Sequence, residues 1–215
     1  HHYRQALDLG DAAYRGDLYI DIALEYENIG HWDHAVEVLN EALLENPKNE
    51  TALHELGFCL DSMGRSKEAI AAFNDFVNRH PYSCPGWYNL GNVFQRTGKY
   101  PRAIEAYEYA LVIDEGFSPA LLQKAASLTM MEDYTEALEC YRESLLMDAP
   151  QANIYTLMGE CKERLGALSE AEEYYYFALD LDAEFSDAHV GLGVTSEMRK
   201  DWTSSKKHFE KALAL

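Results

Sequence analysis

His31-Trp32-Asp33-His34 is the first group of residues whose types and spacing could do chemistry, because two histidines three residues apart can share a metal ion. No cysteine and no second histidine pair stands beside this group in the sequence, so it lacks a full set of ligands. We therefore interpret it as a solvated turn, with Asp33 near the start of a helix, and expect no metal site.

Carboxylates are the second candidate, because the chain is rich in them and pairs such as Glu160 and Glu163 fall at helical spacing. Catalysis would need a nucleophile, a base and a group that orients the base, and no such arrangement recurs in the sequence. No glycine-rich phosphate loop is present either. We therefore expect a protein that is not an enzyme and that needs no cofactor.

The chain contains four cysteines, none of them in a C-x-x-C arrangement: Cys59, Cys84, Cys140 and Cys161. Without a secretory context, such cysteines are expected to be reduced and partly buried. This pattern favours a cytoplasmic protein.

The charge of the chain excludes some classes of partner. The formal net charge is −19, and no basic stripe offsets it, so nucleic acid and anionic membrane surfaces are poor partners. The sequence has no run of 18 apolar residues, so we expect no membrane span. Acidic residues outnumber basic ones by eight to one in 16–49 and by eight to two in 152–185, but only by four to three in 84–117. A nearly neutral centre between acidic flanks favours a basic partner, although acidic surfaces also serve solubility.

Residues 84–117 show how the elements of this chain are built. Trp87, Leu90 and Phe94 fall on one face of a first helix, with Gly91 beside them. A glycine inside a helix costs about 1 kcal/mol relative to alanine, so we expect a second helix to press closely against it. Gly98 ends the first helix, and Pro101 suits the first turn of the next.

The same pattern returns every 34 residues. The small residue that begins the core face of the second helix is Ala35, Ala69, Ala103, Ala137 and Ala171, and the next step gives Ser205. The motif Trp87-x2-Leu90-Gly91-x2-Phe94, followed by Ala103-x3-Tyr107, resembles the tetratricopeptide repeat. The resemblance covers residues 16–215 and implies an all-α solenoid of stacked antiparallel helix pairs without strands. We expect a bacterial multi-repeat array.

This period divides the chain into a single solenoid over residues 1–215. Residues 1–15 are expected to be the tail of a preceding repeat, and six repeats follow: 16–49, 50–83, 84–117, 118–151, 152–185 and 186–215. Ser66 and Ser118 are predicted N-caps. Repeat four departs most from the pattern, because Glu132 stands where repeats two, three and five have glycine.

The resemblance implies a concave groove lined mainly by the first helix of each repeat. The groove positions would then be His54, Glu55, Phe58, Tyr88, Asn89, Asn92, Gln95, Arg96, Gln123, Met130, Asn153 and Glu160. Chaperone-binding members hold a carboxylate with lysine and arginine, but Tyr88, Asn153 and Leu157 stand at those positions here. An acidic chaperone tail is therefore disfavoured.

A second surface is predicted from Tyr174-Tyr175-Tyr176-Phe177. Tyr175 aligns with the core positions Phe73 and Tyr107, which leaves Tyr176 and Phe177 facing solvent. This pair either forms a convex contact surface or packs into the next repeat.

Three functions follow from these observations. The leading interpretation is a non-enzymatic scaffold for protein–protein interaction that binds an extended, net-basic peptide or protein segment in its groove, with Asn and Gln side chains on the peptide backbone. An alternative is the substrate-selecting portion of a larger enzyme, such as a protein glycosyltransferase. A third is a module that self-associates through its solenoid ends. The apolar ending at Leu215 indicates either a segment of a longer array or an end covered by contacts.

Overall fold

The computed structural model describes residues 15–215, which fall into two compact units, 15–115 and Gly116–Leu215. The predicted tail of a preceding repeat, residues 1–15, lies almost wholly outside the described residues. The organisation of both units as one continuous solenoid stays a prediction.

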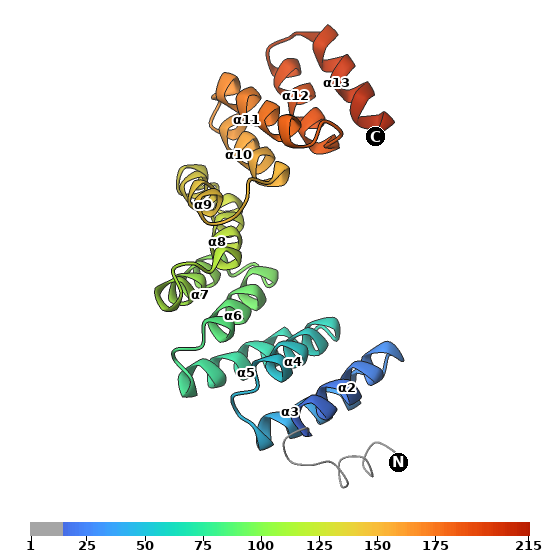
Figure 1. The fold of residues 1–215 in the computed structure, drawn as a ribbon, viewed down its shortest axis with the longest axis vertical. Helices are drawn as coiled ribbons and strands as arrows, with labels where there is room; N and C mark the ends of the chain where they lie inside the picture. The colour runs from blue at the N-terminus through green and yellow to red at the C-terminus, as the bar shows by residue number, and fades with distance from the viewer. Residues whose placement is uncertain (1–14) are drawn as a thin grey trace. The chain divides into compact units, whose positions relative to one another are not determined.

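Helices make up both units, and residues 15–215 contain no strand. In each repeat two helices lie side by side, joined by a short turn (Figure 1). The first unit contains α2 (Arg15–Asn28), α3 (Trp32–Glu45), α4 (Glu50–Ser62), α5 (Ser66–Arg79), α6 (Cys84–Arg96) and α7 (Tyr100–Ile113). The second contains α8 (Ser118–Met130), α9 (Tyr134–Met147), α10 (Ala152–Arg164), α11 (Leu168–Leu181), α12 (Ser186–Met198) and α13 (Trp202–Ala214). The predicted all-α fold of paired helices is confirmed.

Close packing between the two helices of a repeat explains the glycines inside the first helices. A Cβ atom added to Gly91 would lie 2.4 Å from Cε1 of Tyr107, a residue of the neighbouring helix that is fully buried. Gly159 and Tyr175 form the same pair in the second unit, where the distance would be 2.5 Å. Only glycine leaves room for these rings, as the sequence predicts.

The turns between the paired helices need a left-handed backbone. Gly98 has φ +70° there, with no atom within 4 Å of an added Cβ. Glu132 takes φ 64° at the aligned position of repeat four, and Lys200 takes φ 63° in repeat six. Glu132 and Lys200 therefore keep the turn geometry without glycine. Their left-handed backbone conformation costs conformational free energy that glycine would not cost.

Helix capping differs from the prediction. Ser66 and Ser118 are the first residues of α5 and α8, and neither is an N-cap; Arg65 and Phe117 hold those positions without a side-chain cap. The Ser118 hydroxyl instead donates to the Asp148 carboxylate. The N-cap predictions were wrong because the repeat register places the helix start one residue earlier than the serine pattern suggests.

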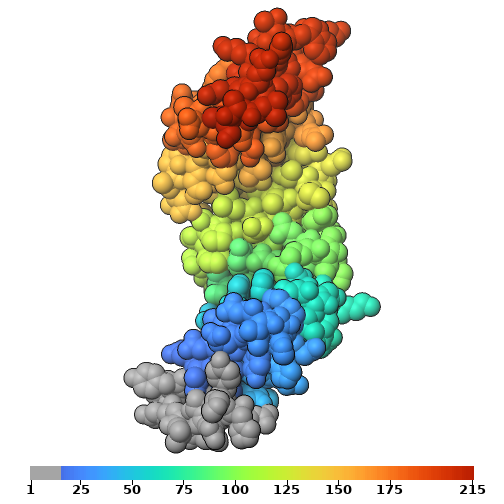
Figure 2. Space-filling model, turned by 90° about the vertical axis from the view of Figure 1, so that its right-hand side faces the viewer, coloured from blue at the N-terminus to red at the C-terminus, as the bar shows by residue number. Residues whose placement is uncertain are grey.

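Each unit buries its own apolar core. In the second unit α11 and α12 share a buried cluster of Ala171, Tyr175, Ala178, Ala188 and Leu192. In the first, Leu39, Leu53, Phe73, Leu90 and Phe94 are buried. Successive repeats follow one another in chain order within each unit (Figure 2). Among the described helices, none is both long and apolar enough to cross a lipid bilayer.

Candidate functional site

A hollow lies between α4 and α6, the first helices of repeats two and three, in the first unit. Its volume is about 230 Å³. Gly57, Phe73, Asn89 and Val93 are its buried residues. The remaining lining residues are at least partly exposed: His54, Phe58, Asp61, Asn92 and Arg96. Five predicted groove residues therefore meet in one hollow, namely His54, Phe58, Asn89, Asn92 and Arg96.

Asn89 is the unusual residue in this hollow. Its exposed fraction is only 8%. Among residues 15–215, no side-chain hydrogen bond is formed by Asn89. Its amide atoms are not among the fully buried unpartnered atoms, so they still reach the open space of the hollow. The amide thus keeps its donor and acceptor capacity for a molecule that enters the hollow.

Asn92 and Gln95 are held in place by Tyr107. The Tyr107 hydroxyl lies 2.9 Å from Asn92 Oδ1 and 2.9 Å from Gln95 Oε1, so it donates toward both amide oxygens. Burial raises the pKa of this tyrosine, which keeps the hydroxyl protonated as a donor. The Tyr88 ring lies beside Tyr107, with the ring centroids 6.0 Å apart. Neither amide –NH₂ group takes part in the Tyr107 contact.

Arg96 is not a free cation in this groove. Its Nε atom lies 2.8 Å from Asp61 Oδ2, so the two charges compensate each other at the rim of the hollow. This ion pair cannot be predicted from the sequence, because Arg96 and Asp61 lie on different helices and no spacing pattern pairs them. The hollow itself is therefore polar but nearly neutral.

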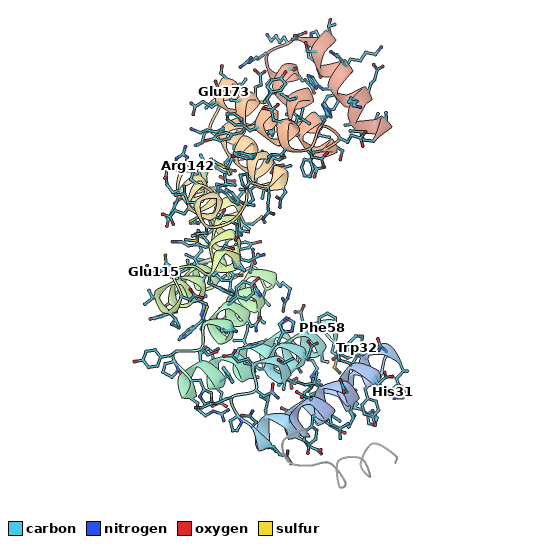
Figure 3. All side chains as sticks on the ribbon, viewed as in Figure 1. His31, Trp32, Phe58, Glu115, Arg142 and Glu173 are labelled. Carbon is cyan, nitrogen blue, oxygen red and sulfur yellow. The ribbon has the colours of Figure 1, made fainter. Side chains whose placement is uncertain are left out.

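Phe58 of the hollow forms an aromatic pair with Trp32, and two carboxylates, Glu55 and Glu27, lie near this pair. Phe58 is 48% exposed, and its ring meets the edge of Trp32, with centroids 6.0 Å apart at 64° (Figure 3). Glu55 lies one helical turn before Phe58 and contacts His54, whose Nδ1 is 3.2 Å from Glu55 Oε1. Glu27 of α2 accepts a hydrogen bond from the Cys59 thiol at 3.2 Å. Burial raises the pKa of Glu27, as does the nearby Glu55.

The remaining predicted groove residues lie in the second unit. Gln123 on α8 is half-buried, while Met130, Asn153 and Glu160 are exposed. Burial and the neighbouring Glu163 raise the pKa of Glu160, whereas Arg164 opposes that rise. Glu163 accepts a hydrogen bond from Tyr175 at 3.1 Å. These side chains lie along the first helices of repeats four and five.

The second predicted surface is present on α11. Tyr176 is 51% exposed and Phe177 is 50% exposed, whereas Tyr175 is fully buried, as predicted. Phe177 contacts Tyr155 and Tyr174, with ring centroids 5.7 and 6.3 Å apart. Tyr155 and Tyr174 belong to the same repeat as Phe177, so these contacts do not show packing into the next repeat, and the convex contact surface stays a prediction.

The histidine pair and the cysteines noted in the sequence form no metal-binding cluster among the described residues. The rings of His31 and His34 lie 5.7 Å apart, and no cluster of three or more metal-ligating side chains occurs in residues 15–215. All four cysteines are free and buried. Burial raises the pKa of Cys84 to about 11, so that thiol stays protonated near neutral pH.

Three residues that contact the predicted groove residues or their neighbours could not be predicted from the sequence: Trp32, Tyr107 and Glu27. Trp32 opens a second helix, where the repeat pattern predicts no groove residue. Tyr107 appears there only as a core residue, and Glu27 lies at the end of α2. Their roles depend on contacts between residues 12 to 32 positions apart, which no local spacing reports.

Family models confirm what the geometry indicates. Three models described as tetratricopeptide repeats match residues 1–81, 85–117 and 128–184. The chain belongs to the tetratricopeptide repeat family. A bacterial origin is not among the features that these matches establish.

The matched relatives are diverse and distant. The chain is 24% identical to the human protein O-mannosyl-transferase TMTC1 over 183 residues, which covers 83% of this chain and 20% of that protein. It is 23% identical to an Hsp70-Hsp90 organizing protein of Triticum aestivum, covering 99% of this chain and 37% of that protein. The chain therefore spans only about a fifth to just over a third of these two relatives.

A solved structure shows the same fold. A tetratricopeptide repeat protein from Parabacteroides merdae superimposes with a TM-score of 0.77 at 16% identity, covering 93% of this chain and 79% of that one. At this level of identity the likeness concerns the fold alone.

Proposed function

We propose that this protein is a non-enzymatic scaffold for protein–protein interaction that binds an extended, net-basic protein segment along the first helices of its repeats. The binding site begins at the hollow between α4 and α6. The observation that carries the proposal is Asn89, a nine-tenths-buried amide in that hollow without a hydrogen-bond partner in the described chain. A peptide group offers the donor and acceptor that such an amide lacks.

The neighbouring amides support the same ligand. Asn92 also lines the hollow, and Tyr107 fixes its oxygen, so its –NH₂ group is presented in one orientation. A pre-oriented donor loses little conformational entropy on binding. Asn89 and Asn92 can thus hold a peptide backbone whatever its side chains are.

Charge favours a basic segment. Acidic residues outnumber basic ones by eight to one in repeat one, and Arg96 is already paired with Asp61. The field should speed encounter with a basic segment more than it tightens the complex. Because such attraction is screened over about 8–10 Å at physiological salt, affinity should fall as salt rises.

The relatives agree with an interaction role in general terms. The wheat relative is named for organizing Hsp70 and Hsp90. The lack of lysine at Tyr88, Asn153 and Leu157 argues against an acidic tail as ligand here. We place the protein in the cytoplasm, in keeping with its free, buried cysteines.

Fluorescence anisotropy with the full chain tests the proposal. Labelled extended peptides of equal length, one basic, one neutral and one acidic, are titrated at several salt concentrations. The basic peptide should bind best, and Asn89→Ala should weaken it about threefold to tenfold at every salt concentration, since a lost hydrogen bond costs about 0.5–1.5 kcal/mol. Asn78→Ala is the matched control, because Asn78 is exposed on α5. Equal binding of all three peptides, or no effect of Asn89→Ala, would overturn the proposal.

The positions in the second unit belong to the proposal as secondary sites. Gln123, Met130, Asn153 and Glu160 are placed to contact a bound segment, and Tyr176 and Phe177 form an exposed aromatic surface on α11. Alanine variants at these positions should reduce affinity less than Asn89→Ala, because Met130, Asn153 and Glu160 are exposed and a ligand desolvates exposed positions less completely.

A second candidate is favoured by one comparison. The human O-mannosyl-transferase relative makes this chain resemble the repeat portion of a larger enzyme, in which it would select the protein substrate. The full-length gene separates the candidates, since a catalytic domain beyond either end would support the second one. Self-association through the ends is the third, and light scattering over a concentration series tests it.

A further inference from the structure

Phe58, an exposed residue that lines the hollow, forms an aromatic pair with the partly buried Trp32. Their rings are 6.0 Å apart in an edge-on arrangement, and Phe58 leaves 48% of its surface in solvent (Figure 3). The two residues come from α3 and α4, so packing within one helix does not explain the contact. A cation over the face of such a ring is attracted by its quadrupole.

Two carboxylates adjoin this pair without compensating lysine or arginine. Glu55 is three residues before Phe58 on α4, and side chains at this spacing are neighbours on a helix. The Glu55 side chain is only 20% exposed, and its Oε1 atom contacts Nδ1 of His54. Glu27 accepts from the Cys59 thiol, and within the described chain neither Glu27 nor Glu55 forms an ion pair with lysine or arginine.

The surroundings of Glu27 raise its pKa. Burial is the largest cause, the Cys59 hydrogen bond opposes the rise, Glu55 adds to it and His54 opposes it. Two partly buried carboxylates therefore repel each other at this point. A cation that joined them would relieve the repulsion.

Phe58 belongs to the hollow that contains Asn89. Phe58 and His54 line the hollow together with Asn89, so the Phe58 ring and the unpartnered amide border one depression, while Trp32 contacts Phe58 from outside this lining. Asn89 is the independent sign of a ligand, because its amide is nine-tenths buried and unpaired among residues 15–215.

We propose that the corner formed by Trp32, Glu55 and Phe58, with Glu27 behind it, binds the guanidinium group of one arginine in the segment whose backbone lies on Asn89. This inference rests on the proposed function and adds its specificity. Arginine fits better than lysine because its planar group can stack on an aromatic ring while donating to a carboxylate.

The probes are two nine-residue peptides, Gly-Ser-Gly-Ser-Arg-Gly-Ser-Gly-Ser and the same peptide with citrulline in place of arginine. Citrulline keeps the planar shape and loses the charge. Binding to the full chain is followed by two-dimensional NMR titration, which measures weak affinities. The arginine peptide should bind about tenfold more tightly, in line with charge-assisted hydrogen bonds being about twice as strong as neutral ones.

Two variants test the corner itself. Glu55→Gln and Phe58→Leu should each remove most of the preference for arginine over citrulline, and both keep the size and solvent exposure of the site close to the original. Glu41→Gln is the matched control, because it makes the same charge change at an exposed position of α3 outside the corner. The preference should survive this control.

The outcomes separate the two proposals. If both peptides bind equally and Asn89→Ala weakens both, the corner is wrong and the groove stands. If Glu41→Gln reduces the preference as much as Glu55→Gln does, the effect is long-range charge and the corner is wrong. If neither peptide binds, both proposals are overturned.

Discussion

Tyr107 is the residue on which core and groove depend together. Its ring fills the space that Gly91 leaves, and its hydroxyl reaches the amide oxygens of Asn92 and Gln95. A core residue therefore sets the orientation of groove residues on the neighbouring helix. Repeat five has a related arrangement, in which Tyr175 packs on Gly159 and donates to Glu163.

We predict that Tyr107→Phe lowers stability by about 1 kcal/mol, because the hydroxyl is lost from a buried position and leaves two amide oxygens without this donor. The variant should also weaken the basic peptide about threefold, since Asn92 is no longer held. Urea unfolding and anisotropy measure the two effects. Tyr82→Phe is the control, because Tyr82 is 87% exposed and should change neither quantity. Unchanged peptide binding by Tyr107→Phe would show that the hydroxyl does not orient the groove.

At the scale of elements, the six helix pairs follow from the sequence. A 34-residue period, the apolar spacing and the turn glycines predict paired helices without strands, and residues 15–215 contain such pairs. Prediction failed where the repeat register outweighs local signals, as at Ser66 and Ser118. It also could not foresee that Glu132 would adopt the left-handed turn that glycine normally supplies.

That turn yields a prediction about stability. A non-glycine residue in the left-handed region costs about 1–2 kcal/mol, offset in part by the greater unfolded-state entropy of glycine. Glu132→Gly should therefore stabilise the protein by up to about 1 kcal/mol. Gly98→Glu makes the reverse change at the aligned position, where an added Cβ meets nothing within 4 Å, and should destabilise by a similar amount. Thermal unfolding followed by circular dichroism checks both, and changes of the same sign would contradict this explanation of the turns.

The last helix pair contains a histidine contact that predicts a response to pH. Nδ1 of His189 lies 3.3 Å from Nδ1 of His208, and Nε2 of His189 is buried without a partner in residues 15–215. Burial lowers the pKa of His208, and the neighbouring His189 and Lys207 lower it further. The folded state therefore binds fewer protons than the unfolded state, so stability falls as the pH drops below about 6.5, the ordinary histidine value.

Urea midpoints at pH 8 and pH 5.5 measure this loss. His208→Gln should make the difference between the two pH values smaller, because the histidine whose pKa is lowered by folding is gone. His31→Gln, at an exposed histidine of the first unit, should leave the difference as it is in the original protein. An equal effect of both variants would place the pH response outside the His189–His208 contact.

At the scale of the whole molecule, composition indicates the class of partner that we propose, but it does not indicate the position of the proposed binding site. The net charge of −19 and its uneven distribution favour a basic segment. Five of the predicted groove residues do meet in one hollow. The features on which the proposed binding site rests were not readable from the sequence, because the pairing of Arg96 with Asp61 and the unpaired state of Asn89 depend on contacts between separate helices.

NMR titration of the full chain with the basic peptide tests the central claim most directly. Side-chain amide signals of asparagine are resolved, and the Asn89 signal is assigned by its loss in Asn89→Ala. We predict that the Asn89 and Asn92 side-chain signals shift first and furthest, together with backbone amides of α4 and α6, while the exposed Asn78 signal stays in place. Shifts confined to the surface of α5, to α11 or to the last helix pair, with Asn89 unmoved at saturation, would contradict the assignment of the binding site.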